Sequence, residues 1–153
     1  MINPLRRRSN ELISADLSSG QPWDLGRWND GERVNMARWR TGLRVPERAR
    51  PVKIMVKIGY TSDRPDGLPS ASTLDQLEKI EGTLIGELAE NDAALVLILT
   101  GYSAREFIAY GSSHAFLQSW GPTVLERWES THPGSGVEAE LDPKWRTFRS
   151  YSK

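Results

Sequence analysis

The clearest pattern in the chain lies from Val52 to Tyr60, where the apolar residues Val52, Ile54, Val56 and Ile58 alternate with Lys53, Met55 and Lys57. This period of two predicts a strand with one buried face. A near-continuous apolar run, Ala94–Thr100, predicts a strand that is covered on both faces. Two more strands are predicted at Arg105–Tyr110, which returns after a turn, and at Val137–Leu141, where the alternation recurs.

Two segments instead place apolar residues three and four positions apart, which predicts amphipathic helices. The first helix begins at Ser72–Asp75, which has the form of a capping box. Gly82 and Gly86 lie inside it, each costing about 1 kcal/mol relative to Ala, so we expect them to allow close approach to the sheet. The second follows Gly111–Ser113, and Gly121-Pro122 is expected to kink or restart it. The two apolar stripes consist of Leu74, Leu77, Ile80, Leu84, Ile85 and Leu88, and of Leu117, Trp120, Val124 and Trp128.

The amino-terminal part predicts a hairpin. Trp23–Trp28 reads as a strand, Asn29-Asp30-Gly31 as its turn and Glu32–Arg40 as the return strand, because Asn, Asp and Gly tolerate positive φ. Neither face of the return strand is uniformly apolar, which favours an outer position. An Arg- and Pro-rich loop is expected at Leu43–Pro51, and Asp142-Pro143 opens a short carboxy-terminal helix or turn.

From residue 52 the predicted order is strand, helix, strand, strand, helix, strand. This βαββαβ order is the ferredoxin-like split βαβ pattern, an α+β fold in which two helices cover one face of an antiparallel sheet. The amino-terminal hairpin extends or flanks that sheet. Residues 1–20 are expected to form a flexible tail and residues 21–153 a single domain, which suits a chain of 153 residues.

Charge and composition narrow the function classes. Lys+Arg and Asp+Glu both number 20, so the net charge is zero, which argues against a dedicated nucleic-acid binder. The absence of Cys excludes disulfides, thiolate catalysis and Cys-ligated metal sites. No signal sequence follows the cluster Arg6–Arg8, whose role the sequence does not specify, and no apolar run is long enough to span a membrane. We therefore expect a cytoplasmic protein.

The sequence shows no spacing of residues that is typical of a catalytic site. His114 and His132 are the only imidazoles and lack zinc-ligand spacing, so we predict no metal site and no cofactor. Asp63 and Asp66 lie in the loop that enters the first helix, where carboxylates commonly bond to turn amides. The enzymatic alternative is an unfamiliar site formed by Asp63, Asp66 and His114.

Two surfaces are candidates for binding a protein. Trp and Arg, which are enriched at interface hot spots, interleave on the hairpin, and the outer side of the first helix is acidic. The competing interpretations are core packing for the Trp residues and an ordinary solvated face for the acids. Stacking of single-stranded RNA is a further alternative, although the central strands lack the aromatic consensus. The candidate binding residues are Trp28, Arg33, Arg38, Trp39, Glu78 and Glu81.

Several segments together resemble a bacterial family, domain of unknown function 695. Roughly residues 20–151 take part in the resemblance. The family has no established activity, but its layout is similar to that of the small bacterial protein that inhibits ribonuclease E by binding it, which implies a ferredoxin-like core and favours protein binding. The resembling segments are Trp23–Trp39, Val52–Tyr60, Asp66-Gly67-Leu68-Pro69, Leu95–Gly101, Arg105–Tyr110 and Asp142-Pro143-Lys144-Trp145.

Together these observations predict a non-enzymatic protein-binding module. It would act as a regulator, inhibitor or immunity-type protein by occupying the surface of a toxin, a nuclease or another regulated target. An enzyme with a carboxylate/His site and an RNA-binding ferredoxin-like domain are the alternatives. The sequence specifies neither the partner nor the oligomeric state, and it does not indicate whether a pocket binds a small ligand.

Overall fold

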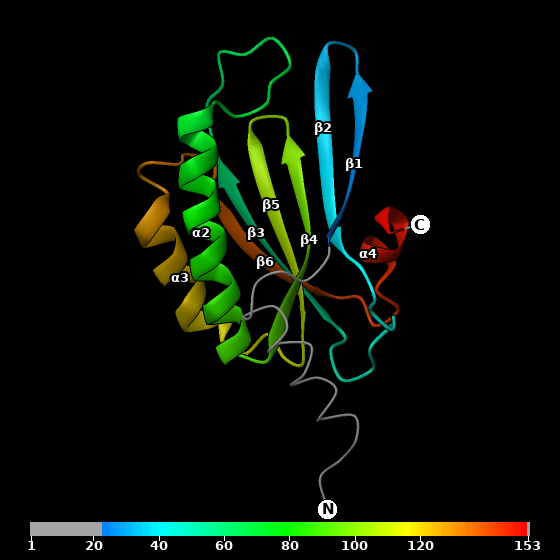
Figure 1. Cartoon of the computed structure of the whole chain (residues 1–153). Helices are drawn as coiled ribbons and strands as arrows, with labels where there is room; N and C mark the ends of the chain where they lie inside the picture. Colours follow the sequence, from blue (N-terminus) through cyan, green and yellow to red (C-terminus); the bar gives the residue numbers. More distant parts are fainter. Residues whose placement is uncertain (1–22, 153) are drawn as a thin grey trace, which may run out of the picture.

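The computed structural model describes residues 23–152 and has an α+β architecture built on one six-stranded sheet (Figure 1). The strand order is β1-β2-β4-β5-β3-β6, and every neighbouring pair is antiparallel. The strands are β1 (Trp23–Asp30), β2 (Arg33–Arg40), β3 (Val52–Gly59), β4 (Ala93–Gly101), β5 (Ala104–Gly111) and β6 (Gly136–Leu141). The helices are α2 (Ala71–Glu90), α3 (Leu117–Trp128) and α4 (Arg146–Tyr151).

One face of the sheet packs against α2 and α3 (Figure 1). Strand β3 contributes its alternate residues to this core, as the period of two predicts. The helices contribute the residues that recur at three- and four-residue spacing. The buried residues of this first core include Val52, Ile54, Val56, Ile58, Leu77, Ile80, Leu84, Leu88, Trp120 and Val124.

The other face of the central strands is covered by α4 and by the loop after β2. Trp145 and Phe148 pack there against Leu97, Ile108 and Tyr110. Strand β4 is therefore buried on both faces, which explains its continuous apolar sequence. A β-bulge shifts its register between Leu95 and Leu97, so that consecutive residues of β4 can serve the second core.

The hairpin extends the sheet beside β4, in the predicted outer position, with β1 at the edge. Its turn was predicted at Asn29-Asp30-Gly31, but Asp30 pairs with Arg33, which leaves Gly31 and Glu32 as the turn. Gly31 has a φ of 65°, a conformation that glycine adopts without steric cost. Strand β1 therefore runs two residues further into the turn than the sequence indicated, and β2 begins one residue later.

Two details of the helices differ from prediction. The residue that caps α2 is Ser70, whose side chain accepts a hydrogen bond from the Thr73 amide, and not Ser72. Helix α3 runs through Pro122 from Leu117 to Trp128 without restarting. The tail expected at residues 1–20 lies outside the described residues. Across residues 23–152, no helix has both the length and the apolar character needed to cross a membrane.

The prediction that Gly82 and Gly86 allow the helix to approach the sheet closely is wrong. A Cβ added at either position would meet no atom within 4 Å, so neither glycine brings the helix backbone close to the sheet. Both therefore carry the conformational cost of glycine in a helix without a packing gain.

We predict that Gly82→Ala and Gly86→Ala each raise the free energy of unfolding by about 0.5–1 kcal/mol, because Ala restricts the unfolded chain and fits the helix. Urea unfolding of the two variants tests this. Gly59→Ala is the matched control, since a Cβ there would overlap the backbone carbonyl oxygen of Pro133, and it should destabilise. A loss of stability in both helix variants would contradict the conclusion that neither glycine contributes to packing.

Candidate partner-binding surface

Exposed apolar side chains gather around the hairpin. Of the four large hydrophobic residues that are exposed in residues 23–152, Leu25 (59%) and Trp28 (43%) lie on β1, and Tyr102 (52%) lies in the β4–β5 turn beside β2. The fourth, Leu141 (74%), lies on β6 at the opposite edge of the sheet. The hairpin side therefore carries most of the exposed apolar surface.

Trp28 lies on the face of the hairpin that α4 covers, where its ring centroid is 6.0 Å from that of Tyr151. Arg33 belongs to the same face, diagonal to Trp28 in the strand register. The Arg33 guanidinium carbon lies 5.3 Å from the centroid of the Tyr102 ring, within the range of a cation–π contact. We call the group Trp28, Arg33, Tyr102 and Tyr151 the hairpin tip surface.

The opposite face of the hairpin contacts α2. Arg38 Nη2 lies 2.5 Å from Glu81 Oε1, and the Arg38 guanidinium carbon lies 5.0 Å from the centroid of the Trp23 ring. The two predicted surfaces, the hairpin and the acidic helix, are thus joined by an ion pair. Arg38 and Glu81 pair with each other, although Arg38 Nε is buried without a hydrogen-bond partner among the described residues. Glu78 stays exposed.

Arg105 on β5 lies beside this ion pair and is only 9% exposed. Its Nε donates a hydrogen bond to Thr100 Oγ1 at 2.9 Å, and it forms no ion pair with another described residue. Burial lowers the pKa of Arg105, and Glu81 opposes that shift. Glu81 therefore stabilises two cations of the sheet, which gives it a structural role.

Trp39 does not contribute to the exposed surface. It is half-buried and packs against the second core, beside Leu97 and Ile108. The competing interpretation, core packing, therefore applies to this residue. Trp28 differs because it lies closer to the turn of the hairpin and is exposed, with its ring beside that of Tyr151.

The structure does not bring Asp63, Asp66 and His114 together. Gly59 pairs with Ala104 and Val52 with Gly111, so the loop after β3 and the segment after β5 leave opposite ends of the sheet, about 25 Å apart along eight residues. Asp66 accepts hydrogen bonds from the Leu68 amide and from Arg64, and these bonds lower its pKa. It serves the turn.

Neither histidine forms a ligand cluster. His114 is exposed, whereas the buried His132 places Nδ1 2.8 Å from the Gly59 carbonyl oxygen, in a structural role. Within residues 23–152, no group of three or more His, Asp and Glu side chains could hold a metal ion.

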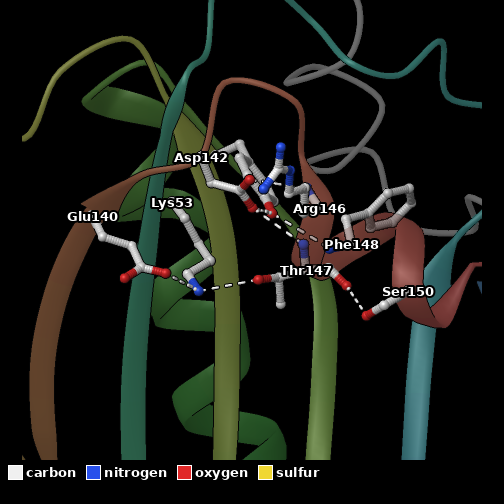
Figure 2. A network of polar contacts seen from close by, with 8 residues as sticks. Lys53, Glu140, Asp142, Arg146, Thr147, Phe148 and Ser150 are labelled. Carbon is white, nitrogen blue, oxygen red and sulfur yellow. Dashed lines mark hydrogen bonds and ion pairs between the residues drawn. The ribbon is translucent and has the colours of Figure 1, made fainter.

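Asp142 organises a polar network that sequence reasoning missed (Figure 2). The Tyr110 hydroxyl donates to its Oδ2 at 2.7 Å, and the Arg146 and Thr147 amides donate to Oδ1 and Oδ2 at 2.9 and 3.2 Å. Burial raises the pKa of Asp142, but the bonds from Tyr110 and the two amides outweigh it, so that the pKa is lowered. The same burial, together with Asp142, raises the pKa of Tyr110.

Trp145 adds further contacts beside this polar network. Its ring stacks on Tyr110 with centroids 4.1 Å apart, and its Nε1 donates to the Arg50 carbonyl oxygen at 2.8 Å. The segment Asp142-Pro143-Lys144-Trp145 thus fixes α4 against the sheet. The Asp-Pro pair ahead of spaced aromatics was the available signal, but it does not reveal that Tyr110 is the partner.

We predict that Asp142→Asn lowers the free energy of unfolding by about 1–3 kcal/mol at pH 7, because charge-assisted hydrogen bonds are lost. A lowered pKa in the folded state means that the ionised carboxylate stabilises the fold above its ordinary pKa of 3.8. That stabilisation disappears as the pH falls through the folded-state pKa, so the gap between wild type and variant should narrow below about pH 4.

Denaturant unfolding across this pH range measures the gap. The control is Asp63→Asn in an exposed loop, which should change stability by less than about 0.5 kcal/mol at pH 7. A gap between wild type and Asp142→Asn that stays constant down to the lowest pH would contradict the role of the carboxylate.

Comparison with known proteins places the chain in a family. The model of the family described as "Family of unknown function (DUF695)" matches residues 23–151. The match includes both the hairpin and α4. No curated protein matches the chain.

Proposed function

The chain belongs to the DUF695 family, whose description assigns no function, and we propose that it is a non-enzymatic protein-binding module. It would act by occupying the surface of a partner such as a toxin, a nuclease or another regulated protein. The proposed contact region is the hairpin tip surface together with the free edge of β1.

The observation that carries this proposal is the clustering of exposed aromatic and apolar side chains at the hairpin. Trp28, Tyr102 and Arg33 are residue types enriched among interface hot spots. Arg33 is positioned over Tyr102, so the cation and the ring are already arranged before a partner arrives. Such an arrangement reduces the entropy lost on binding.

The backbone of β1 supports a protein partner in particular. Because the turn has two residues, Asp30 and Arg33 form the hydrogen-bonded pair that closes the hairpin. The alternation along an antiparallel pair then directs the N–H and C=O groups of Leu25, Arg27 and Asn29 away from β2. No described strand pairs with this edge. An extended segment of a partner could therefore add as a further strand.

The fold supports the same conclusion. We propose that β3, α2, β4, β5, α3 and β6 form a ferredoxin-like split βαβ unit, with the hairpin added beside β4. The antiparallel order β4-β5-β3-β6 and the shared face of α2 and α3 support that assignment. Sheet-type RNA binders use aromatics on the opposite face, but here Tyr110 and Trp145 stack on each other in a core. RNA binding is therefore the less supported alternative.

The enzymatic alternative has less support than binding. Asp63 and Asp66 lie at the opposite end of the sheet from His114. Three buried charged residues, Asp142, Arg50 and Arg105, are bonded within the fold.

Affinity capture from a lysate of cells that express the protein natively tests the proposal. We predict that Trp28→Ala combined with Arg33→Ala reduces the retained partner by at least about tenfold, because hot-spot truncations commonly cost 1–2 kcal/mol or more each. Circular dichroism confirms that the variant is folded.

The matched control is Leu141→Ala, which removes a more exposed apolar side chain from the far edge of the sheet. It should retain the partner at the wild-type level. Equal losses in the hairpin variant and the control, or no stable partner with the wild-type protein, would reject the proposal.

A further inference from the structure

An open hollow lies between α4 and the loop that joins β2 to β3. Val45 from the loop and Arg146, Arg149, Ser150 and Ser152 from the carboxy-terminal segment line it, and its volume is about 610 Å³. The hollow is on the face of the sheet away from α2 and α3, where α4 packs on the second core. It is therefore separate from the Arg38–Glu81 contact.

Two cations line this hollow and two more lie close to it in the sequence. Arg146 and Arg149 are exposed on α4, Arg44 precedes Val45, and Lys144 precedes the helix. None of these four side chains forms an ion pair with a described residue. We call Arg44, Lys144, Arg146 and Arg149 the basic corner.

The nearest acidic groups are already committed elsewhere. Asp142 accepts bonds from the Tyr110 hydroxyl and two backbone amides, and Glu47 pairs with the buried Arg50 at 2.8 Å. Glu140 pairs with Lys53, which also bonds to Thr147 on α4 (Figure 2). The bonds to Asp142 come from neutral groups, so this carboxylate keeps its charge and offsets one of the four cations. The corner therefore retains a net positive charge.

The corner is also held in a fixed geometry. Arg146 and Arg149 are three residues apart on a helix, so their side chains leave α4 on neighbouring positions. Phe148 between them is buried, and Trp145 is stacked on Tyr110. On the other wall, Arg50 fixes the loop to Asp92 at 2.9 Å. The fixed backbone sets the positions from which the two arginine side chains project, and the guanidinium group suits bidentate binding of carboxylates.

We propose that the basic corner is the docking site for an acidic segment, rich in Asp and Glu, of the protein partner. Its guanidinium groups would pair with the carboxylates of that segment, and Ser152 could donate a further hydrogen bond. This inference deepens and rests on the proposed protein-binding function. Tyr151 connects the two regions, because it contacts Trp28 and lies between Ser150 and Ser152.

The limited extent of the positive surface favours a protein segment over a nucleic acid. Glu138 and Glu140 are exposed on β6, next to Lys53, and bound the corner on that side. A polynucleotide would have to bring its phosphates past these carboxylates, whereas a short acidic segment need not. The partly buried Val45 in the lining suits a peptide with some apolar character.

The test uses the full chain and a fluorescently labelled oligoglutamate peptide, with binding followed by fluorescence anisotropy at low salt. Arg146→Ala combined with Arg149→Ala should weaken peptide binding by about tenfold or more. The control, Lys57→Ala combined with Lys79→Ala, removes the same charge from exposed positions elsewhere and should change binding by less than about twofold.

Equal weakening in both double variants would overturn the inference, since it would show only an effect of net charge. Tighter binding of an oligothymidylate or of phosphatidylserine vesicles than of the peptide, lost in the Arg146/Arg149 variant, would overturn it in favour of another partner class. Failure of the proposed function is distinguishable, because capture of the native partner is measured separately with the Trp28/Arg33 variant.

Discussion

The stacking of Trp145 on Tyr110, with Asp142 bonded between them, is the constraint on which the rest of the structure depends. It closes the second face of the sheet, which α2 and α3 leave open. Trp145 adopts a φ of 52° to do so, a conformation that costs a non-glycine residue about 1–2 kcal/mol. Full burial of an indole and a phenol ring contributes more than that cost. Because both faces of β4 and β5 are then buried, polar recognition is confined to the periphery, at the hairpin and around α4.

The contacts between elements also determine which charged side chains remain available to a partner. The chain is neutral, yet its acids and bases are not equally available to a partner. Glu81 pairs with Arg38, and Glu87 pairs with Arg127 on α3, so much of the acidic face of α2 holds neighbouring elements in place. The carboxylate of Asp142 likewise accepts hydrogen bonds from the first two amides of α4. The cations of the basic corner have no such partners among the described residues. Asp75, Glu78 and Glu90 of α2 stay exposed, so the chain offers an acidic helix face as well as the basic corner, which the sequence did not indicate.

Periodicity predicted the strands and the two long helices because each pattern is local. The errors concern choices between nearby residues of equal local propensity. Ser70 and Ser72 can both cap a helix, and only the position of the loop selects Ser70. The hairpin turn could lie at several of the Asn, Asp and Gly positions, and strand pairing decides it. Trp28 and Trp39 lie on the same face of the hairpin, but only the placement of α4 shows which one is covered. The partnership of Tyr110 with Asp142 joins residues 32 apart in sequence, which no local pattern encodes.

The two edges of the sheet differ in a way that bears on function. An exposed edge strand invites pairing with another chain, and proteins commonly protect such edges with charge. Strand β6 has six residues, and Glu138 and Glu140 project from it. Strand β1 has eight residues and exposes Leu25 and Trp28 on its two faces. Leu141 is also exposed, but at the end of β6 it has no aromatic or arginine neighbour comparable to those around Trp28. Both edges therefore carry charge, since Asp24, Arg27 and Asp30 are exposed on β1. Of the two, β1 also exposes an aromatic side chain, which is the arrangement expected of a protein that binds a partner through its hairpin.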